Sequence, residues 1–269
     1  MPLFKCPTKL FRYIPSFHYQ GVQTNSLIGL REITSDSFDL LTDLPKDCII
    51  TLDLPAEAYQ KFEPELTKLG YDLIGAYDYQ VVHLRNSYEE WFNRGTVERR
   101  SIRKALQSGV VVRIGGHEML EIFYDLYMHS VRRWQSKTPR SSFHRFERVE
   151  RLFSFPSDRI QIAIAYYGDL PVSGIIFGAY RRVAAYLFGG FNYEFQHLRS
   201  ANLVHAIVLK KLISEGIAEY SMGISLGNSK LERFKESIGA IRHHAVVIAR
   251  HRYPRLRRLI RHLTYSMSV

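Results

Sequence analysis

The sequence has little cysteine and no long hydrophobic run, and both deficits narrow the class of protein. Its 269 residues include two cysteines, Cys6 and Cys48, and neither belongs to a CxxC pair or a cluster of metal ligands. A disulfide framework and a zinc site are therefore not expected, and free thiols indicate a reducing compartment. No window approaches the roughly 18 apolar residues of a membrane span. We therefore expect a cytoplasmic protein.

Histidine is present without a catalytic or metal-binding spacing. The eleven histidines include no HExxH motif, and the His243-His244 pair is predicted to begin a strand. We therefore predict no metal. Low-complexity tracts and short-period repeats are lacking too, so the organisation of the chain must be read from the order of its helices and strands.

Positive charge is in clear excess. Lysine and arginine number 37 against 26 acidic residues, which gives a formal net charge of +11. This excess predicts an anionic partner, which could be a phosphate group, a nucleic acid or an acidic bilayer surface. Hydrophobic residues make up 46% of the chain, enough for the packed core of one large domain or two modest ones.

The first 87 residues predict a small α/β unit. Apolar patterning and turn residues predict strands over 26–33, 48–55 and 76–84, and a helix over 56–70. A basic helix is predicted over 88–109, where Gly109 closes it. We expect this helix to bridge the two halves of the chain.

The second half predicts an α+β order. A strand at 110–114 and an amphipathic helix at 117–135 come first. Three strands follow with connections so short that they must form antiparallel hairpins: 159–167, 171–180 and 182–191. The sequence then predicts a helix over 201–216 and a strand over 217–223. A second helix, which carries Phe234 and Lys235, and a closing strand over 243–249 follow.

Several strings in this order resemble the Fem-type branch of the GNAT acyltransferases, which comprises peptidoglycan-bridge aminoacyltransferases and their relatives. They are RRSIRKALQSGVVV (99–112), YDLYMHSVRRW (124–134), YYGDLPVSGIIFG (166–178), YLFGGFNYE (186–194) and LERFKESIGA (231–240). The resemblance covers residues 88–242 well. It implies a GNAT-like, mostly antiparallel mixed sheet flanked by helices over 110–250. Residues 1–87 would form a smaller, partial GNAT-like α/β unit before it.

The resemblance also implies an activity. Fem-like GNAT proteins transfer an acyl or aminoacyl group from an activated donor to an amine, here one on a cell-envelope precursor or related metabolite. No tightly bound cofactor is implied, because the donor is a co-substrate. The long helical hairpin that some relatives associate with tRNA is not visible in this sequence. The donor is therefore left open between an acyl-CoA and an aminoacyl-tRNA.

Donor-site residues follow from the position of the loop before the 201–216 helix. GNAT folds hold donor phosphates at the amino end of this helix, where free backbone N–H groups attract anions. The loop here carries Arg199 where the resemblance implies a glycine, followed by Ser200 and Asn202. The pair Gly189-Gly190 ends a predicted strand, where a bulge or a close backbone approach could present an N–H to a carbonyl oxygen.

The remaining candidates would serve catalysis and acceptor binding. Glu194 could take the amine proton. Lys235 follows Phe234 beside an apolar stripe and is either a solvated lysine or, as the resemblance implies, the group that stabilises negative charge. Phe234 is assigned to the donor side. Arg133-Trp134 resembles the end of a helix near the acceptor, although Trp134 could equally be core.

Two basic segments could meet an anionic partner. Residues 251–269 predict a short basic amphipathic helix that could dock on the core, touch an acidic membrane or engage RNA, with docking favoured. The basic run within 99–104 is either a phosphate track or a solvated helix face, and we expect the latter. A non-catalytic GNAT-fold binding protein and a basic RNA-binding module are the alternative functions, because the donor loop departs from the family pattern at Arg199.

Overall fold

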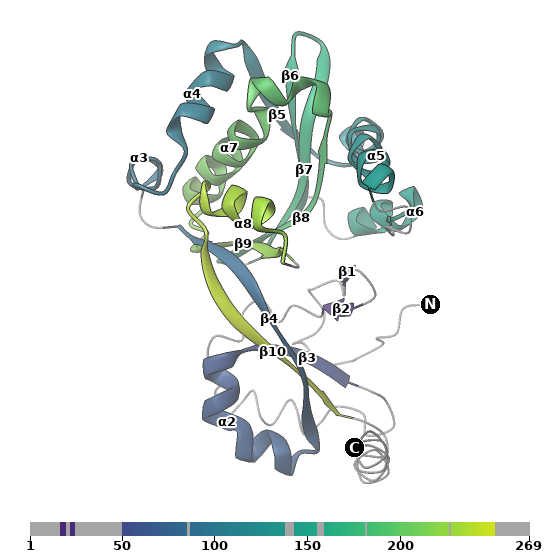
Figure 1. Cartoon of the computed structure of the whole chain (residues 1–269), viewed down its shortest axis with the longest axis vertical. Coiled ribbons are helices and arrows are strands. Elements are labelled where there is room, and N and C mark those ends of the chain that lie inside the picture. Colours follow the sequence, from purple (N-terminus) through teal and green to yellow (C-terminus); the bar gives the residue numbers. More distant parts are fainter. Residues whose placement is uncertain are drawn as a thin grey trace. The chain divides into compact units, whose positions relative to one another are not determined.

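The computed structural model describes eight segments of the chain: residues 17–19, 22–24, 50–84, 87–137, 143–154, 159–180, 182–225 and 227–250. The chain divides into two compact units (Figure 1), one formed by residues 1–78 with 243–269 and the other by 79–242. The two cysteines, the strand predicted at 26–33 and the basic helix predicted at 251–269 lie outside the described residues.

The first unit contains a short α/β sheet. Strand β3 (Ile50–Pro55) leads into α2 (Ala56–Lys68), and β3 pairs antiparallel with β10 (Ile241–Arg250). β10 lies between β3 and the amino-terminal part of β4 (Tyr71–His83). Two further short strands, β1 (Phe17–Tyr19) and β2 (Val22–Thr24), pair with each other. The helix predicted at 56–70 is confirmed, and it includes an internal proline, Pro64.

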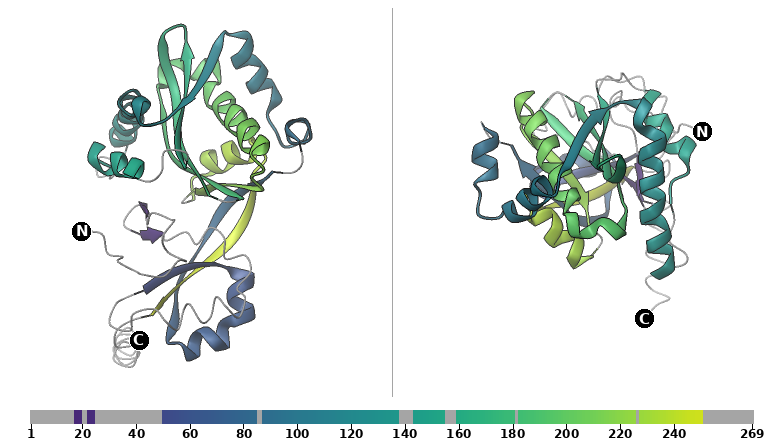
Figure 2. Two further views of the ribbon diagram at one scale, coloured as in Figure 1. Left: turned by 180° about the vertical axis from the view of Figure 1, so that it is seen from behind. Right: turned by 90° about the horizontal axis from the view of Figure 1, so that it is seen from above.

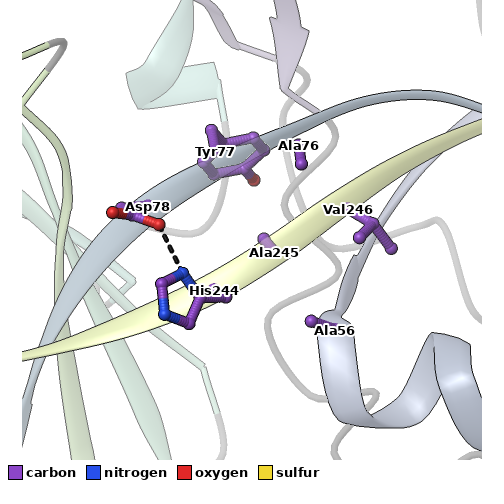
Figure 3. Close-up of a pocket in the computed structure, with 7 residues that line it drawn as sticks. All are labelled: Ala56, Ala76, Tyr77, Asp78, His244, Ala245 and Val246. Carbon is purple, nitrogen blue, oxygen red and sulfur yellow. Dashed lines mark hydrogen bonds and ion pairs between the residues drawn. The ribbon is translucent and has the colours of Figure 1, made fainter.

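A small open cavity of about 390 Å³ lies in this first unit (Figure 3). Its polar feature is a pair formed by Asp78 of β4 and His244 of β10, with 2.5 Å between Oδ1 and Nδ1. The histidine side chain is 73% exposed, so solvent weakens this pair. None of the predicted site residues lines this cavity.

The second unit contains the larger part of the eight-stranded sheet, with strand order β4-β9-β8-β7-β6-β5. The strands are β5 (Val110–Gly115), β6 (Ile160–Tyr167), β7 (Leu170–Tyr180), β8 (Val183–Phe191) and β9 (Glu219–Ile224). Every neighbouring pair is antiparallel except β8 and β9, which are parallel. The predicted hairpins of β6, β7 and β8 are confirmed, and the predicted α+β class holds.

Helices cover both faces of this sheet (Figure 2). The long helix α5 (Leu120–Lys137) follows the turn η1 (His117–Met119) and packs on β7 and β8. The crossover helix α7 (Ser200–Ser214) packs on the opposite face, against β5, β6 and β7. Shorter helices complete the unit: α6 (Phe146–Glu150), η2 (Arg151–Ser154), η3 (Tyr193–Leu198) and α8 (Ser229–Glu236).

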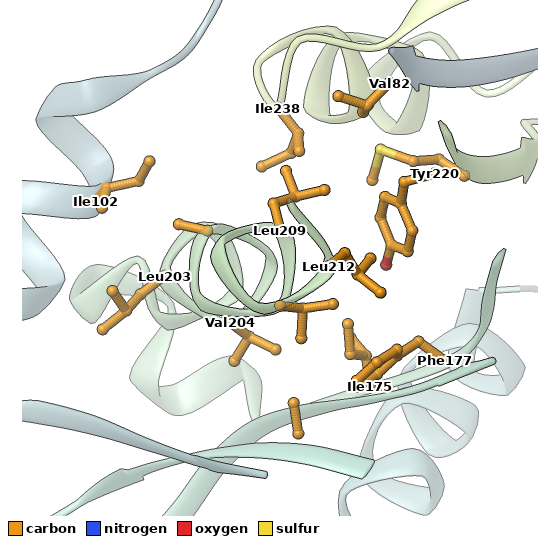
Figure 4. Packing of buried hydrophobic residues seen from close by; sticks show 14 of the residues in the cluster. Val82, Ile102, Ile175, Phe177, Leu203, Val204, Leu209, Leu212, Tyr220 and Ile238 are labelled. Carbon is orange, nitrogen blue, oxygen red and sulfur yellow. The ribbon is translucent and has the colours of Figure 1, made fainter. Parts of the chain in front are cut away.

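The core of the second unit lies around α7 (Figure 4). Leu203, Val204, Leu209 and Leu212 of this helix are at most 2% exposed. α7 is apolar on most of its circumference because the sheet lies on one side of it and α4 (Arg99–Gln107) on the other. Burial on both sides fixes the position of the helix, and therefore the position of its first turn.

The prediction of a single basic helix over 88–109 is wrong. The structure has α3 (Tyr88–Phe92) and α4, separated by residues 93–98. Trp91 is fully buried and its indole N–H donates to the Ile238 carbonyl at 2.9 Å. The backbone N–H of Glu98 donates to the Ser237 carbonyl at 2.8 Å. These long-range hydrogen bonds to the segment after α8 hold residues 93–98 out of a helix. The helical periodicity of the sequence gives no information about such bonds.

Candidate functional site

The centre of the sheet opens where β8 and β9 diverge. These parallel strands pair only from Val183 to Ala185 of β8, against residues 219–221. None of the remaining six residues of β8, up to Phe191, pairs with β9, and all of them except Leu187 pair with β7. Their backbone N–H and C=O groups on the β9 side therefore have no ladder partner within the described strands. Such an edge can hydrogen-bond to a ligand.

A β-bulge marks the start of this open edge. The register of β7 and β8 shifts between Ile176 and Phe177, so Leu187 of β8 has no opposing residue. The bulge therefore lies two residues before Gly189-Gly190. A Cβ at Gly190 would lie 2.6 Å from the Leu126 carbonyl carbon of α5, and a Cβ at Gly189 would collide with the Tyr186 hydroxyl. The glycines thus allow close approach of α5 and of the Tyr186 ring.

Arg199 precedes α7 in a strained conformation. With φ 57° and ψ 27°, it is the only described residue other than glycine with positive φ. The left-handed region costs a residue with a side chain about 1–2 kcal/mol, and this is the position where the resemblance implies a glycine. Arg199 is exposed and its side chain does not cap α7. Backbone strain at an exposed residue that packing does not require indicates that the arginine side chain has a function.

The first turn of α7 holds two buried polar side chains. Ser200 is 0% exposed, and its hydroxyl has no hydrogen-bond partner among the described residues. Asn202 is 8% exposed and donates from Nδ2 to the Ser237 hydroxyl at 3.4 Å. That bond ties the start of α7 to the end of α8. The backbone N–H of Asn202 donates to the Arg199 carbonyl at 3.1 Å. The first N–H groups of a helix are otherwise generally available to an anion.

Lys235 points into the protein. It is 1% exposed, and Nζ donates to the carbonyls of Gly223 at 2.9 Å and Ile224 at 2.8 Å. No carboxylate lies within ion-pair distance of it among the described residues. Burial lowers the pKa of Lys235 to about 8, and the nearby Glu232 carboxylate opposes this shift. The amine thus holds the end of β9, beyond the last residue that pairs with β8.

A buried aromatic cluster surrounds His205 of α7. The His205 ring lies 5.4 Å from Tyr186, 5.9 Å from Tyr220 and 5.6 Å from Phe234, in edge-to-face contacts. A hydrogen bond of 3.2 Å joins Nδ1 of His205 to the Tyr220 hydroxyl. Burial, reinforced by the Lys235 charge, lowers the pKa of His205 to about 3. Burial raises the pKa of Tyr220 well above its usual value. Both groups are therefore neutral at pH 7.

A second group of predicted residues lies at the carboxyl end of β8. Glu194 is exposed in η3, where its backbone N–H is capped by Asn192. The Arg133 guanidinium of α5 lies 4.7 Å from the centre of the Tyr193 ring. Trp134 is 40% exposed and packs edge-on against Tyr127. Arg133 of α5 thus contacts Tyr193, the residue that precedes Glu194 in the chain.

The structure therefore sorts the predicted residues into two sets. Arg199, Glu194 and Trp134 are exposed, whereas Lys235, Ser200 and Asn202 are buried. The sequence analysis did not single out Tyr186, His205 and Tyr220, which form the aromatic cluster that Phe234 joins. One signal was available, because His205 interrupts the apolar run of α7. Its hydrogen-bond partner, Tyr220, lies on β9, and the sequence does not show that the two meet.

Comparison with known proteins identifies the family. Residues 94–236, just over half of the chain, match the family model described as an acetyltransferase (GNAT) domain. The chain belongs to this family, as the sequence predicts. A comparison with curated protein sequences found no significant match.

Solved structures share the fold at low sequence identity. FemX superposes with a TM-score of 0.62 at 13% identity, covering 74% of this chain and 71% of FemX. L-PGS from Bacillus licheniformis gives 0.53 at 11% identity, covering 75% and 68%. The C-terminal domain of a putative lysylphosphatidylglycerol synthetase from Agrobacterium fabrum gives 0.52 at 8%, covering 75% and 67%. The fold is thus GNAT-like and shared with FemX, as the predicted Fem-like branch implies.

Proposed function

We propose that the chain is a cytoplasmic, Fem-like N-acyltransferase. It would move an acyl or aminoacyl group from an activated donor to an amine of a cell-envelope precursor or a related metabolite. The observation that carries this proposal is the divergence of β8 from β9 after Ala185, directly upstream of η3 and α7. An open strand edge offers N–H groups to a carbonyl oxygen, and the start of α7 offers N–H groups to donor phosphates.

The reaction needs no covalent enzyme intermediate. The neutral amine attacks the donor carbonyl carbon, a C–N bond forms, and the carbonyl oxygen becomes an oxyanion. Collapse breaks the C–S bond of a thioester or the C–O bond of an aminoacyl ester. The amine gives up a proton and the leaving sulfur or oxygen takes one, so no redox partner is needed.

Exposed residues and the half-buried Arg133 would meet the substrates in this scheme. Arg199 would pair with a donor phosphate at the start of α7, Glu194 would accept the amine proton, and Arg133 with Trp134 would contact the acceptor. The N–H groups of the edge near Gly189-Gly190 would stabilise the oxyanion, a contribution worth about 3 kcal/mol at one such donor in other enzymes.

Buried residues would fix the positions of the strands and helices that carry these contacts. Lys235 holds the carbonyls at the end of β9, and Phe234 packs on His205. Asn202 links α7 to the residue after α8. We assign Lys235 to positioning, since its ammonium is occupied by backbone carbonyls in the absence of substrate. A substrate that displaced these carbonyls would give it the charge-stabilising role that the family resemblance implies.

The donor could be an acyl-CoA or an aminoacyl-tRNA, because both present phosphates. A non-catalytic binding protein is the second candidate. The observation that favours it is Arg199, whose side chain stands where a pyrophosphate would approach a glycine backbone.

Arg199 provides the test of the donor site. In Arg199→Gly the left-handed strain is relieved, and we expect the free energy of unfolding to stay equal or rise by up to about 1 kcal/mol. Donor affinity should nevertheless fall about tenfold or more, because a charge-assisted hydrogen bond contributes about 1.5–3 kcal/mol. Thermal-shift titrations with acetyl-CoA and with an aminoacyl-tRNA measure both quantities, since ligand at a hundred times its Kd adds about 2.7 kcal/mol.

Arg199→Lys is the matched control, because it keeps the charge and the strain. It should retain most of the donor affinity. Equal affinity of the wild type and Arg199→Gly would remove Arg199 from the donor site. Failure of both donors to stabilise the wild type would contradict the transferase and favour the non-catalytic candidate.

A further inference from the structure

Helix α4 carries a charge pattern that opposes its own stability. Its nine residues, RRSIRKALQ, contain four cations and no acidic residue. Arg99 and Arg103 are spaced i,i+4, as are Arg100 and Lys104, and like charges at this spacing destabilise a helix by about 0.2–0.5 kcal/mol per pair. Two of the cations also occupy the first turn, where the helix dipole disfavours positive charge. Such a pattern is expected where the charge meets a partner.

Nothing in the described part of the second unit neutralises these cations. None of the four forms an ion pair with an acidic side chain there. Arg99 contacts the Asn93 amide oxygen at 3.5 Å, and the Arg103 guanidinium lies 5.9 Å from the Phe92 ring centre. Both contacts are weak, and neither partner carries a charge that would neutralise the arginine. Arg100, Arg103 and Lys104 are exposed, while Ile102 and Ala105 on the opposite face of α4 are buried.

Large apolar side chains are exposed beside this basic face. Leu106 in the last turn of α4 is 55% exposed. The register then places the ends of three strands together: Val110 pairs with Tyr167, which pairs with Leu170. Tyr167 is 43% exposed and Leu170 is 56% exposed. Because β5 is the edge strand of the sheet, this end of the unit has no neighbouring strand beyond it.

We propose that this α4–β5 surface docks on an anionic lipid bilayer. The surface consists of the exposed cations Arg100, Arg103 and Lys104 with the exposed apolar residues Leu106, Tyr167 and Leu170. Basic side chains next to protruding apolar ones match a bilayer interface, where the cations meet headgroup phosphates and the apolar groups enter the acyl region. A nucleic acid would use the cations but would leave the aliphatic side chains exposed to water.

The acidic groups around the surface are few. Asp169 lies in the turn between Tyr167 and Leu170, and Glu98 lies at the opposite end of α4. Neither lies within the basic face of the helix. None of the described helices is long and apolar enough to cross a membrane, so the contact would be peripheral. It would require no acyltransferase activity and is independent of the proposed function.

Vesicle flotation with the full chain tests the lipid contact. The probes are phosphatidylcholine vesicles with and without 30% phosphatidylglycerol. Binding should require the anionic lipid, and the triple variant Arg100→Gln, Arg103→Gln, Lys104→Gln should bind about a hundredfold more weakly, at about fivefold per cation. The control Lys61→Gln, Lys68→Gln, Lys230→Gln removes the same net charge from exposed positions elsewhere and should bind within a factor of three of the wild type.

The apolar residues separate a bilayer from a nucleic acid. Leu106→Gln and Leu170→Gln should each weaken vesicle binding about fivefold, since about half of each leucine side chain would be withdrawn from water, and should leave RNA binding unchanged. The inference is overturned if the wild type ignores phosphatidylglycerol, if the control triple loses as much binding as the α4 triple, or if the leucine variants bind vesicles like the wild type. A thermal melt confirms that each variant folds.

Discussion

Lys235→Met should lower turnover at least tenfold and leave the chain folded. The variant loses two hydrogen bonds from a charged donor, which contribute about 1.5–3 kcal/mol each. It also removes the cost of burying the amine, which a pKa lowered to about 8 puts at about 3 kcal/mol. The difference is a loss of about 0–3 kcal/mol, too small to unfold a domain of ordinary stability. Turnover should fall by a larger factor than stability, because the end of β9 beside the open edge of β8 loses both hydrogen bonds to Lys235.

Lys230→Met on the same helix is the control for this prediction. Lys230 is exposed, and its replacement should change neither turnover nor stability. Chemical denaturation measures the unfolding free energies, and turnover is measured with whichever donor stabilises the wild type. A folded Lys235→Met with undiminished turnover would remove Lys235 from the site.

The pH dependence of the same variant tests whether the lysine is buried. A lysine with a folded pKa of about 8 and an ordinary unfolded pKa near 10.5 binds the extra proton in the unfolded state between these values. The free energy of unfolding therefore rises with pH in this window. From pH 7 to pH 9 the wild type should gain about 1 kcal/mol relative to Lys235→Met. No relative gain would show that the amine reaches solvent.

Acid should destabilise the protein through His205. The pKa of this histidine is about 3 in the fold and about 6.5 in the unfolded chain, so the unfolded state binds the extra proton between these values. The free energy of unfolding should fall as the pH drops below 6.5. The loss due to His205 should be about 2 kcal/mol at pH 5 and approach about 5 kcal/mol near pH 3, comparable to the stability of a whole domain.

His205→Gln removes this titration while keeping a polar partner for Tyr220. The unfolding free energy of this variant should depend less on pH between 4 and 7 than that of the wild type. His197→Gln, at an exposed position of η3, should retain the wild-type pH dependence. If His205→Gln lost stability in acid as steeply as the wild type, His205 would not be a buried neutral histidine.

The sequence predicted the strands of the second unit because their connections are short. Two-residue links between β6, β7 and β8 leave only antiparallel pairing, and a 15-residue crossover helix allows the parallel β8–β9 pair. The break between α3 and α4 was not predictable, since it depends on a bond from Trp91 to Ile238. Local periodicity carries no information about partners about 150 residues away.

The candidate site shows the same division. Loop chemistry singled out Arg199, and its backbone has the left-handed conformation that a glycine would adopt. Helical periodicity placed Lys235 beside an apolar stripe but could not decide between solvent and interior, because the carbonyls it binds belong to β9. The contact of His205 with Tyr220 likewise depends on how α7 packs on the sheet. Side-chain roles that depend on long-range packing need the fold.

Amide formation is the most direct measure of the central claim. Mass spectrometry would follow a panel of primary amines, including amino-sugar and diamino-acid-containing envelope precursors, incubated with the full chain and either acetyl-CoA or charged tRNA. The account predicts an amine whose mass rises by that of the transferred acyl or aminoacyl group less the displaced proton, at a rate that falls at least tenfold in Lys235→Met. Donor binding without any amide product across the panel would contradict it and leave a GNAT-fold binding protein.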